Sequence, residues 1–128
     1  MQPQPLIAVA DVIASSLWYQ QLLGCKSGHG GAEYEQLVDS KGHMILQLHA
    51  WGAHHHKYLG DRSVAERGNG MLLWFQVNDF AAALVRIAAL HIKVLQGPLL
   101  NRNAQHREVW LRDPDGYTVV LAGQHGEF

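Results

Sequence analysis

The sequence predicts an α+β fold made of two copies of one module, each a strand, a helix and three further strands. Residues 9–12 (Val-Ala-Asp-Val) recur as residues 77–80 (Val-Asn-Asp-Phe), 68 positions later. A helical apolar stripe follows each Asp, and a hairpin pattern closes each half. An internal repeat in a chain of 128 residues indicates two packed modules, and we expect a site between them.

Each repeated segment ends an apolar run and starts a helical pattern. Asp11 and Asp79 are suited to cap a helix, because a carboxylate accepts hydrogen bonds from the unpaired N–H groups of the first turn. Apolar positions then recur at three- and four-residue steps, which keep side chains on one helical face. We therefore expect two helices, each preceded by a strand: strand 6–9 with helix 12–23, and strand 71–77 with helix 80–90.

The other strands are predicted from paired patterns that flank turn sequences. We expect two hairpins: residues 34–38 with 43–49, and residues 105–112 with 117–122. Their turns, Asp-Ser-Lys-Gly and Asp-Pro-Asp-Gly, are rich in turn-forming residues. Residues 26–32 hold several glycines, which favours a loop or a weak edge strand. Residues 93–95 should form a short strand that Gly97-Pro98 terminates.

Length and composition favour a single domain over residues 1–128. We expect module one over about residues 4–50, a linking loop over about 51–69, and module two over about 70–123; a loop that long is usually functional or links modules. The chain is 48% hydrophobic and 16% charged, as in a compact globular protein. A net charge of −1 gives no electrostatic reason to expect nucleic acid or membrane as a partner.

Cysteine content and the first residues bear on the cell compartment. Cys25 is the single cysteine, so an intrachain disulfide is excluded. The sequence begins Met-Gln-Pro-Gln-Pro and shows no signal-peptide pattern there. We therefore expect a cytoplasmic protein.

Alternation along the strands separates an aliphatic face from a mixed one. The aliphatic face must be covered by the helices. The opposite face carries large rings beside a few polar groups: Gln47, His49, Trp74, Gln76, Glu108 and Trp110. Rings supply contact area and polar groups fix orientation, as a small-molecule cavity requires. We predict that these six residues bind a small organic molecule, aromatic or cationic.

Two segments resemble a known family. Residues 11–24 open with Asp-Val and end in Leu-Leu-Gly, and residues 108–117 read Glu-Val-Trp-Leu-Arg-Asp-Pro-Asp-Gly-Tyr. They resemble the opening helix and the closing hairpin of the vicinal oxygen chelate superfamily, the glyoxalase/bleomycin resistance protein/dioxygenase group. The resemblance implies two βαβββ modules that form a cupped, incomplete mixed-sheet barrel with helices outside, and often a homodimer.

The resemblance also implies where a metal would bind. Metal-dependent members hold the ion from four positions, which correspond here to Gln4, Gln47, Leu72 and Val120, although a count from the first hairpin turn points to Leu46 in place of Gln47. Leucine and valine cannot bind a cation, and catalytic metals require three or four ligands. We therefore expect no metal and no other cofactor.

The residues leave three classes of function open. The first is a metal-free small-molecule-binding protein that sequesters an antibiotic or other toxic compound, as in the non-metal branch of the family. The alternative is a small lyase or isomerase with His49 or Glu108 as general base. The third is an interaction module with a vestigial cavity.

The three consecutive histidines and Glu108 each have more than one interpretation. His54, His55 and His56 are expected in a surface loop, with a lid or a metal site as alternatives, because consecutive side chains point in different directions. Glu108 is expected to pair with a neighbour such as Arg112, or else to recognise a cationic or hydroxyl group of the ligand.

Overall fold

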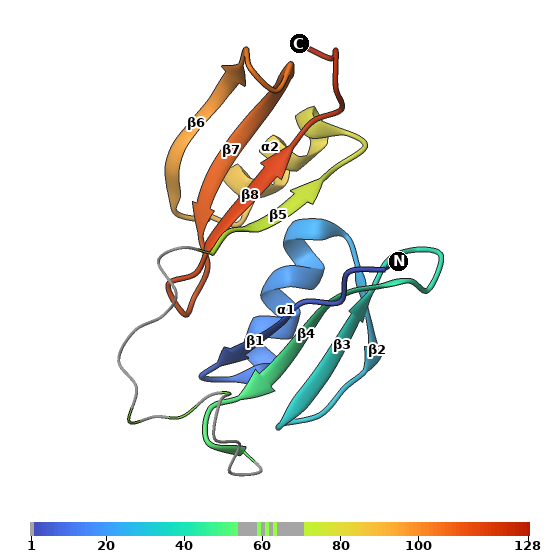
Figure 1. Cartoon of the computed structure of the whole chain (residues 1–128), viewed down its shortest axis with the longest axis vertical. Helices are drawn as coiled ribbons and strands as arrows, with labels where there is room; N and C mark the ends of the chain where they lie inside the picture. Colours follow the sequence, from blue (N-terminus) through green and yellow to red (C-terminus); the bar gives the residue numbers. More distant parts are fainter. Residues whose placement is uncertain (1, 54–58, 60, 62, 64–70) are drawn as a thin grey trace. The chain divides into compact units, whose positions relative to one another are not determined.

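The computed structural model describes residues 2–53, 59, 61, 63 and 71–128. They belong to two compact units, Met1–Glu66 and Arg67–Phe128 (Figure 1). Most of the predicted linking loop lies outside the described residues, and so do His54, His55 and His56.

The first unit is a four-stranded mixed sheet with one helix. Its elements are β1 (Leu6–Val9), α1 (Val12–Leu23), β2 (Lys26–His29), β3 (Tyr34–Val38) and β4 (Met44–Ala50). The strand order is β1-β4-β3-β2. β1 and β4 are parallel, and the other neighbours are antiparallel. The glycine-rich segment after α1 thus forms an edge strand, which is one of the two predicted outcomes.

The second unit repeats this topology. Its elements are β5 (Leu73–Gln76), α2 (Phe80–Ala89), β6 (Val94–Asn101), β7 (His106–Arg112) and β8 (Thr118–Ala122). The strand order is β5-β8-β7-β6, with β5 and β8 parallel. The predicted α+β fold of two βαβββ modules is therefore confirmed.

The two helices begin in the same way. The Asp11 side chain accepts a hydrogen bond of 3.0 Å from the backbone N–H of Ala14, and Asp79 accepts one of 2.9 Å from Ala82. Both Asp residues have extended backbones, as an N-cap requires. The repeated Asp is thus a repeated cap.

The two hairpin turns are also copies of each other. Asp39 Oδ1 accepts from the N–H groups two and four residues later, both at 2.9 Å. Asp113 Oδ1 accepts from the N–H groups at the same two offsets, at 2.9 and 2.8 Å. The fourth residue of each turn, Gly42 or Gly116, has a φ of 83° or 91°, which favours glycine. The repeat therefore extends to the conformation of the turns.

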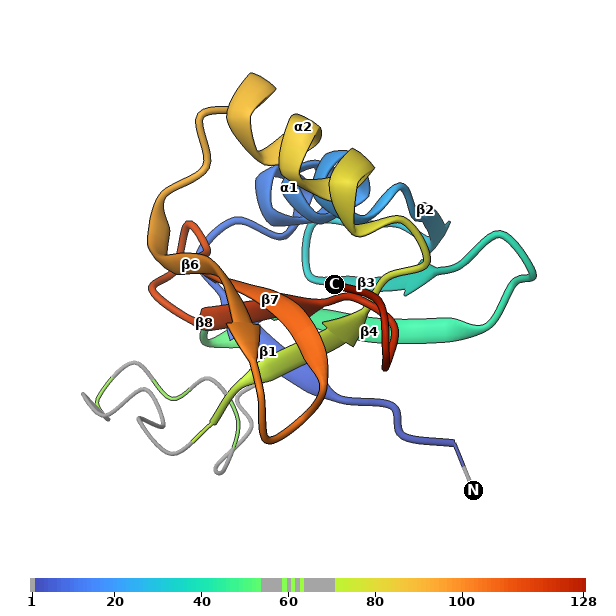
Figure 2. The same cartoon turned by 90° about the horizontal axis from the view of Figure 1, so that it is seen from above.

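Each helix covers the aliphatic face of its own sheet, and Figure 2 shows each on one side of its strands. The fully buried strand residues of these faces are Val9, Leu37, Leu46 and Leu48 in the first unit and Val109, Leu111, Val119 and Leu121 in the second. Buried helix residues pack above them: Val12, Tyr19 and Leu22 from α1, and Phe80, Ala83 and Ile87 from α2. The prediction of which strand side chains face the helix and which face the other side of the sheet is therefore correct in both units.

A carboxylate lies among the aliphatic residues of the first unit. Glu35, on β3, is only 3% exposed. It accepts hydrogen bonds of 2.8 Å from the hydroxyls of Ser16, on α1, and Ser27, on β2. Gln20 donates to the Ser16 hydroxyl at 2.9 Å. These bonds satisfy the buried carboxylate and explain why a serine occupies the buried stripe of α1.

The prediction that Gly97-Pro98 terminates a short strand is wrong. β6 continues through this pair from Val94 to Asn101, with shifts in register on either side of it. β6 is an edge strand, where a residue without an N–H is tolerated. A Cβ on Gly97 would lie 2.8 Å from the carbonyl oxygen of Glu108, so the close approach to β7 requires glycine.

The helices of the described residues are short. None has the length and apolar content needed to cross a bilayer.

Candidate functional site

The sheet face opposite α2 carries the predicted aromatic residues. Trp74 and Trp110 both lie beside Val120 in the register, and Glu108 and Gln76 both lie beside Ala122. Residues that pair on adjacent strands point to the same side of the sheet, so these side chains lie on one face, away from α2. We call Trp74, Asn101, His106, Glu108 and Trp110 the aromatic face.

Glu108 accepts hydrogen bonds from three other side chains of the aromatic face. Its carboxylate accepts from His106 Nε2 at 2.8 Å and from the indole Nε1 of Trp110 at 3.1 Å. A longer bond, 3.3 Å, comes from the side-chain amide of Asn101, on β6. The residue is 4% exposed, so these donors take the place of water around the carboxylate. One acid thus fixes the orientation of an indole and an imidazole.

The rings form a continuous cluster. The Trp74 centroid lies 6.5 Å from that of Trp110, with the ring planes at 84°, and 5.7 Å from the His106 ring. Edge-to-face geometry of this kind is the favourable arrangement for aromatic pairs. Trp74 is 43% exposed, so part of its ring surface is accessible.

The pKa of the Glu108 carboxyl is lowered from its ordinary value of 4.5. Burial is the largest single influence and would raise the pKa, but the hydrogen bonds from His106, Trp110 and Asn101 together outweigh it. Glu108 is therefore ionised at neutral pH, and it can only accept hydrogen bonds in that state.

A lowered pKa links Glu108 to the acid stability of the protein. The ionised form stabilises the fold above the unfolded-state pKa, and this contribution is lost as pH falls through the lower folded-state pKa. We expect the stability difference between wild type and Glu108→Gln to shrink when pH falls from about 6 to about 3. Urea unfolding of both proteins, monitored by circular dichroism at each pH, measures this difference. A difference that is constant over this range would contradict the assigned network.

The expected pairing of Glu108 with Arg112 is not observed. Glu108 instead pairs with His106, and the Arg112 guanidinium donates to the carbonyl of Gly116 and the hydroxyl of Thr118 at 2.9 and 3.0 Å. His106 and Asn101 are site residues that the sequence prediction omitted. For His106 a signal was present, because it lies two residues before Glu108 and shares its parity.

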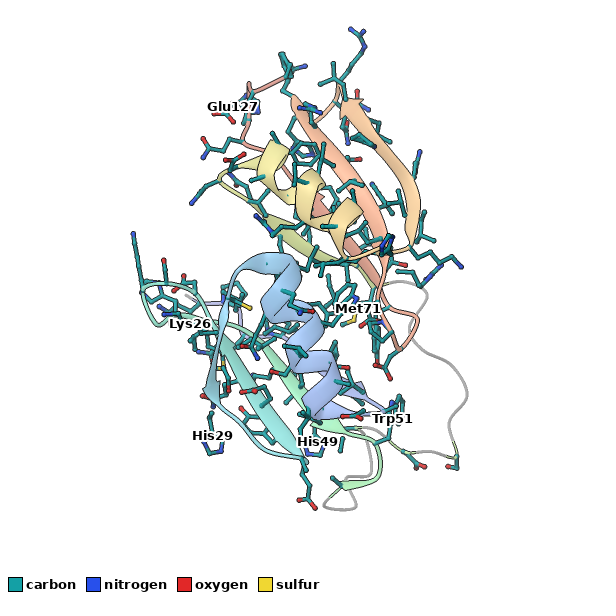
Figure 3. All side chains as sticks on the ribbon, turned by 180° about the vertical axis from the view of Figure 1, so that it is seen from behind. Lys26, His29, His49, Trp51, Met71 and Glu127 are labelled. Atoms are coloured by element: carbon teal, nitrogen blue, oxygen red, sulfur yellow. The ribbon has the colours of Figure 1, made fainter. Side chains whose placement is uncertain are left out.

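The corresponding face of the first unit carries Gln47 and His49. Gln47 accepts a hydrogen bond of 2.6 Å from the Tyr34 hydroxyl and donates one of 2.9 Å to the carbonyl of Gln4. His49, which Figure 3 labels, is 5% exposed. Its Nδ1 lies 2.9 Å from the carbonyl oxygen of Ala50. Register places Tyr34 beside His49, so these side chains share a face. This face is an amide and phenol network, whereas the second unit has an indole and carboxylate network.

Strand register decides between Gln47 and Leu46 as a metal-ligand position. β1 and β4 pair Leu6 with Gln47, and β5 and β8 pair Trp74 with Val120. Leu6 and Trp74 are 68 positions apart and so are equivalent in the repeat, which makes their strand partners Gln47 and Val120 equivalent as well. Leu46 instead lies under α1 with no exposed surface.

The residues at the family's metal positions do not fit a metal. Leu72 and Val120 are hydrocarbon side chains, and Val120 has no exposed surface. The Gln47 amide is engaged with Tyr34 and Gln4. Within the described ranges, no group of three or more His, Cys, Asp or Glu side chains could hold an ion.

Cys25 is poorly suited to nucleophilic chemistry. It is 8% exposed, and its Sγ lies 3.6 Å from the carbonyl oxygen of Tyr19. Burial raises the pKa of the thiol to about 11, so the reactive thiolate is scarce at neutral pH.

Comparison with known proteins identifies the fold. A family model described as Glyoxalase/Bleomycin resistance protein/Dioxygenase superfamily matches residues 2–121. No curated protein matches the chain significantly.

Solved structures share the fold at low sequence identity. A protein of unknown function from Agrobacterium tumefaciens str. C58 is 22% identical, with a TM-score of 0.77 over 97% of this chain and 94% of that one. A lactoylglutathione lyase from Agrobacterium tumefaciens is 18% identical, with a TM-score of 0.71 over 96% and 92%. A protein from the mobile metagenome of V. Pseudocholerae is 21% identical, with a TM-score of 0.72 over 96% and 93%.

Proposed function

Because the chain belongs to the glyoxalase/bleomycin resistance protein/dioxygenase superfamily, we propose that it binds a small, planar organic molecule without a metal. The aromatic face of the second unit is the proposed binding surface. In the form that we favour, binding sequesters an antibiotic or other toxic compound, which needs affinity and no chemical step.

The observation that carries this proposal is the network around Glu108. It fixes the rings of Trp110 and His106 by hydrogen bonds, and the Trp74 ring packs against both. Fixed rings lose little conformational entropy when a ligand binds, so more of the contact energy appears as affinity. An ionised carboxylate behind the rings also favours a ligand with positive charge, since a cation is attracted to the face of an indole.

The geometry favours binding over catalysis by Glu108. Its oxygens already accept from three side chains, and its lowered pKa makes it a weak base at neutral pH. A lyase or isomerase that uses His49 or Glu108 as general base stays a prediction, and no described contact favours it.

A thermal-shift screen tests the proposal. The protein is unfolded by heat in the presence of aromatic metabolites, antibiotics and divalent metals, each added separately. A ligand at 100 times its Kd adds about 2.7 kcal/mol of stability, so we expect at least one planar compound, and no metal alone, to raise the melting temperature. Stabilisation by a metal and by no organic compound would contradict the proposal.

Trp110→Ala is the matched variant for any compound that the screen finds. Loss of one aromatic wall should cost about 1–3 kcal/mol of binding, which is roughly a 5- to 150-fold loss of affinity. Gln47→Ala and His49→Ala, measured against the same compound, test whether these predicted residues also contribute. The predicted homodimer is tested separately, by light scattering at micromolar concentration.

A further inference from the structure

We propose that His106 acts as a general base on the aromatic face, taking a proton from a planar carbon acid that lies against Trp74 and Trp110. This inference rests on the proposed function, because it places chemistry on the same surface. The sequence predicts His49 or Glu108 as the general base of an enzyme, whereas here the base is His106 and Glu108 orients it.

The hydrogen bond to Glu108 selects the tautomer of His106. An ionised carboxylate can only accept, so the bond of 2.8 Å requires that Nε2 carries the proton. In the neutral imidazole, Nδ1 then holds a lone pair. No side chain or carbonyl of the described residues binds Nδ1, and the imidazole side chain is 13% exposed. None of the described residues has a buried side-chain nitrogen or oxygen without a partner, so Nδ1 of His106 keeps some accessible surface on the aromatic face.

The charges around His106 favour this role. Glu108 lies at hydrogen-bond distance and stabilises the imidazolium that forms when Nδ1 takes a proton. Arg107, the next residue along β7, points to the other face of the sheet, with its guanidinium carbon 4.8 Å from the Phe80 ring centre. Its positive charge therefore does not lie on the side where the imidazolium forms.

The surroundings restrict the substrate class. The Trp74 indole beside the imidazole, with Trp110 against it, suits a flat, aromatic molecule, and the negative charge of Glu108 disfavours an anion. The acidic C–H must lie at the edge of the flat ring system to meet Nδ1, and an adjacent electron-withdrawing group must activate it. Neutral heteroaromatic carbon acids satisfy these conditions.

A suitable probe is 5-nitro-1,2-benzisoxazole. Nδ1 of His106 takes the proton from C3, the C–H electron pair forms the second π bond of a nitrile, and the N–O bond breaks. The oxygen leaves as a phenolate, whose absorbance reports the rate, and the imidazolium returns its proton to water. The reaction needs no oxidant, reductant or second substrate.

The experiment compares wild type with His106→Gln, Glu108→Gln and His91→Asn. Glutamine at 106 keeps an amide that can donate to Glu108 but removes the base. His91 is exposed and outside the aromatic face, so its variant controls for a histidine elsewhere in the unit. Tryptophan fluorescence quenching by the probe measures binding independently of turnover.

We expect wild type to open the probe at least about 100-fold faster than an equal concentration of free imidazole. His106→Gln should lose this acceleration, whereas His91→Asn should keep it. Glu108 is a positioning residue, so Glu108→Gln should lower kcat about tenfold or more with little change in KM.

The outcomes separate the two proposals. Quenching by the probe with equal turnover in wild type and His106→Gln would overturn the general base and leave the binding function standing. Neither quenching nor turnover, up to the solubility limit of the probe, would count against both.

Discussion

Replacement of Glu108 by alanine should lower the free energy of unfolding by about 3 kcal/mol. The carboxylate is 4% exposed and satisfies donors from His106, Trp110 and Asn101, and alanine would leave all of them without an acceptor. Trp110 and Asn101 are only partly buried, so water can compensate some of the loss. Urea denaturation monitored by circular dichroism measures the change.

Glu108→Gln is the matched control. Its amide oxygen can still accept from the Trp110 indole, and His106 can change tautomer to accept from the amide nitrogen. The expected loss is about 1 kcal/mol. Similar losses for alanine and glutamine would mean that charge, and not the set of hydrogen bonds, stabilises this face. A loss below about 0.5 kcal/mol for alanine would contradict the network.

Replacement of Leu111 by alanine should cost about 2–5 kcal/mol, because the side chain has no exposed surface and its removal leaves a cavity in the aliphatic core under α2. Val85→Ala is the control. Val85 lies on α2 and is 69% exposed, so truncation there should change stability by less than about 0.5 kcal/mol. Equal losses in the two variants would mean that the wrong face of β7 is assigned to the core.

The repeat made the fold predictable. The cap at Asp11 and the cap at Asp79 involve only residues within the next turn, so a sequence pattern can specify them. Strand parity was predictable for a similar reason, because successive side chains must alternate between the aliphatic core and the opposite face.

The path of β6 could not be predicted from local rules. Gly97-Pro98 is a breaker within an isolated segment, yet an edge strand next to β7 accommodates it through shifts in register. The burial of Glu35 was equally hidden. It depends on Ser16 and Ser27, which belong to other elements and come close only in the folded unit.

The predicted assignment of side chains to the two faces of the sheet was correct, whereas Arg112 was wrong as the partner of Glu108. Residues two apart on a strand are separated by about 7 Å, whereas residues four apart are separated by about 13 Å. His106 and Trp110 are therefore within reach of Glu108, and Arg112 is too distant for a direct bond along a regular strand. The spacing of residues along one strand is known from the sequence, so the partners of Glu108 on β7 could have been predicted. The contribution of Asn101 could not, because it depends on the register between β6 and β7.

The central claim is that the protein binds an organic molecule on the aromatic face without a metal. Isothermal titration of the best compound from the screen, into protein freed of metal by a chelator, tests this claim most directly. We predict binding that is unchanged by chelation and about 5- to 150-fold weaker in Trp110→Ala. Binding that disappears on chelation, returns on addition of a divalent metal and is insensitive to Trp110→Ala would contradict the account.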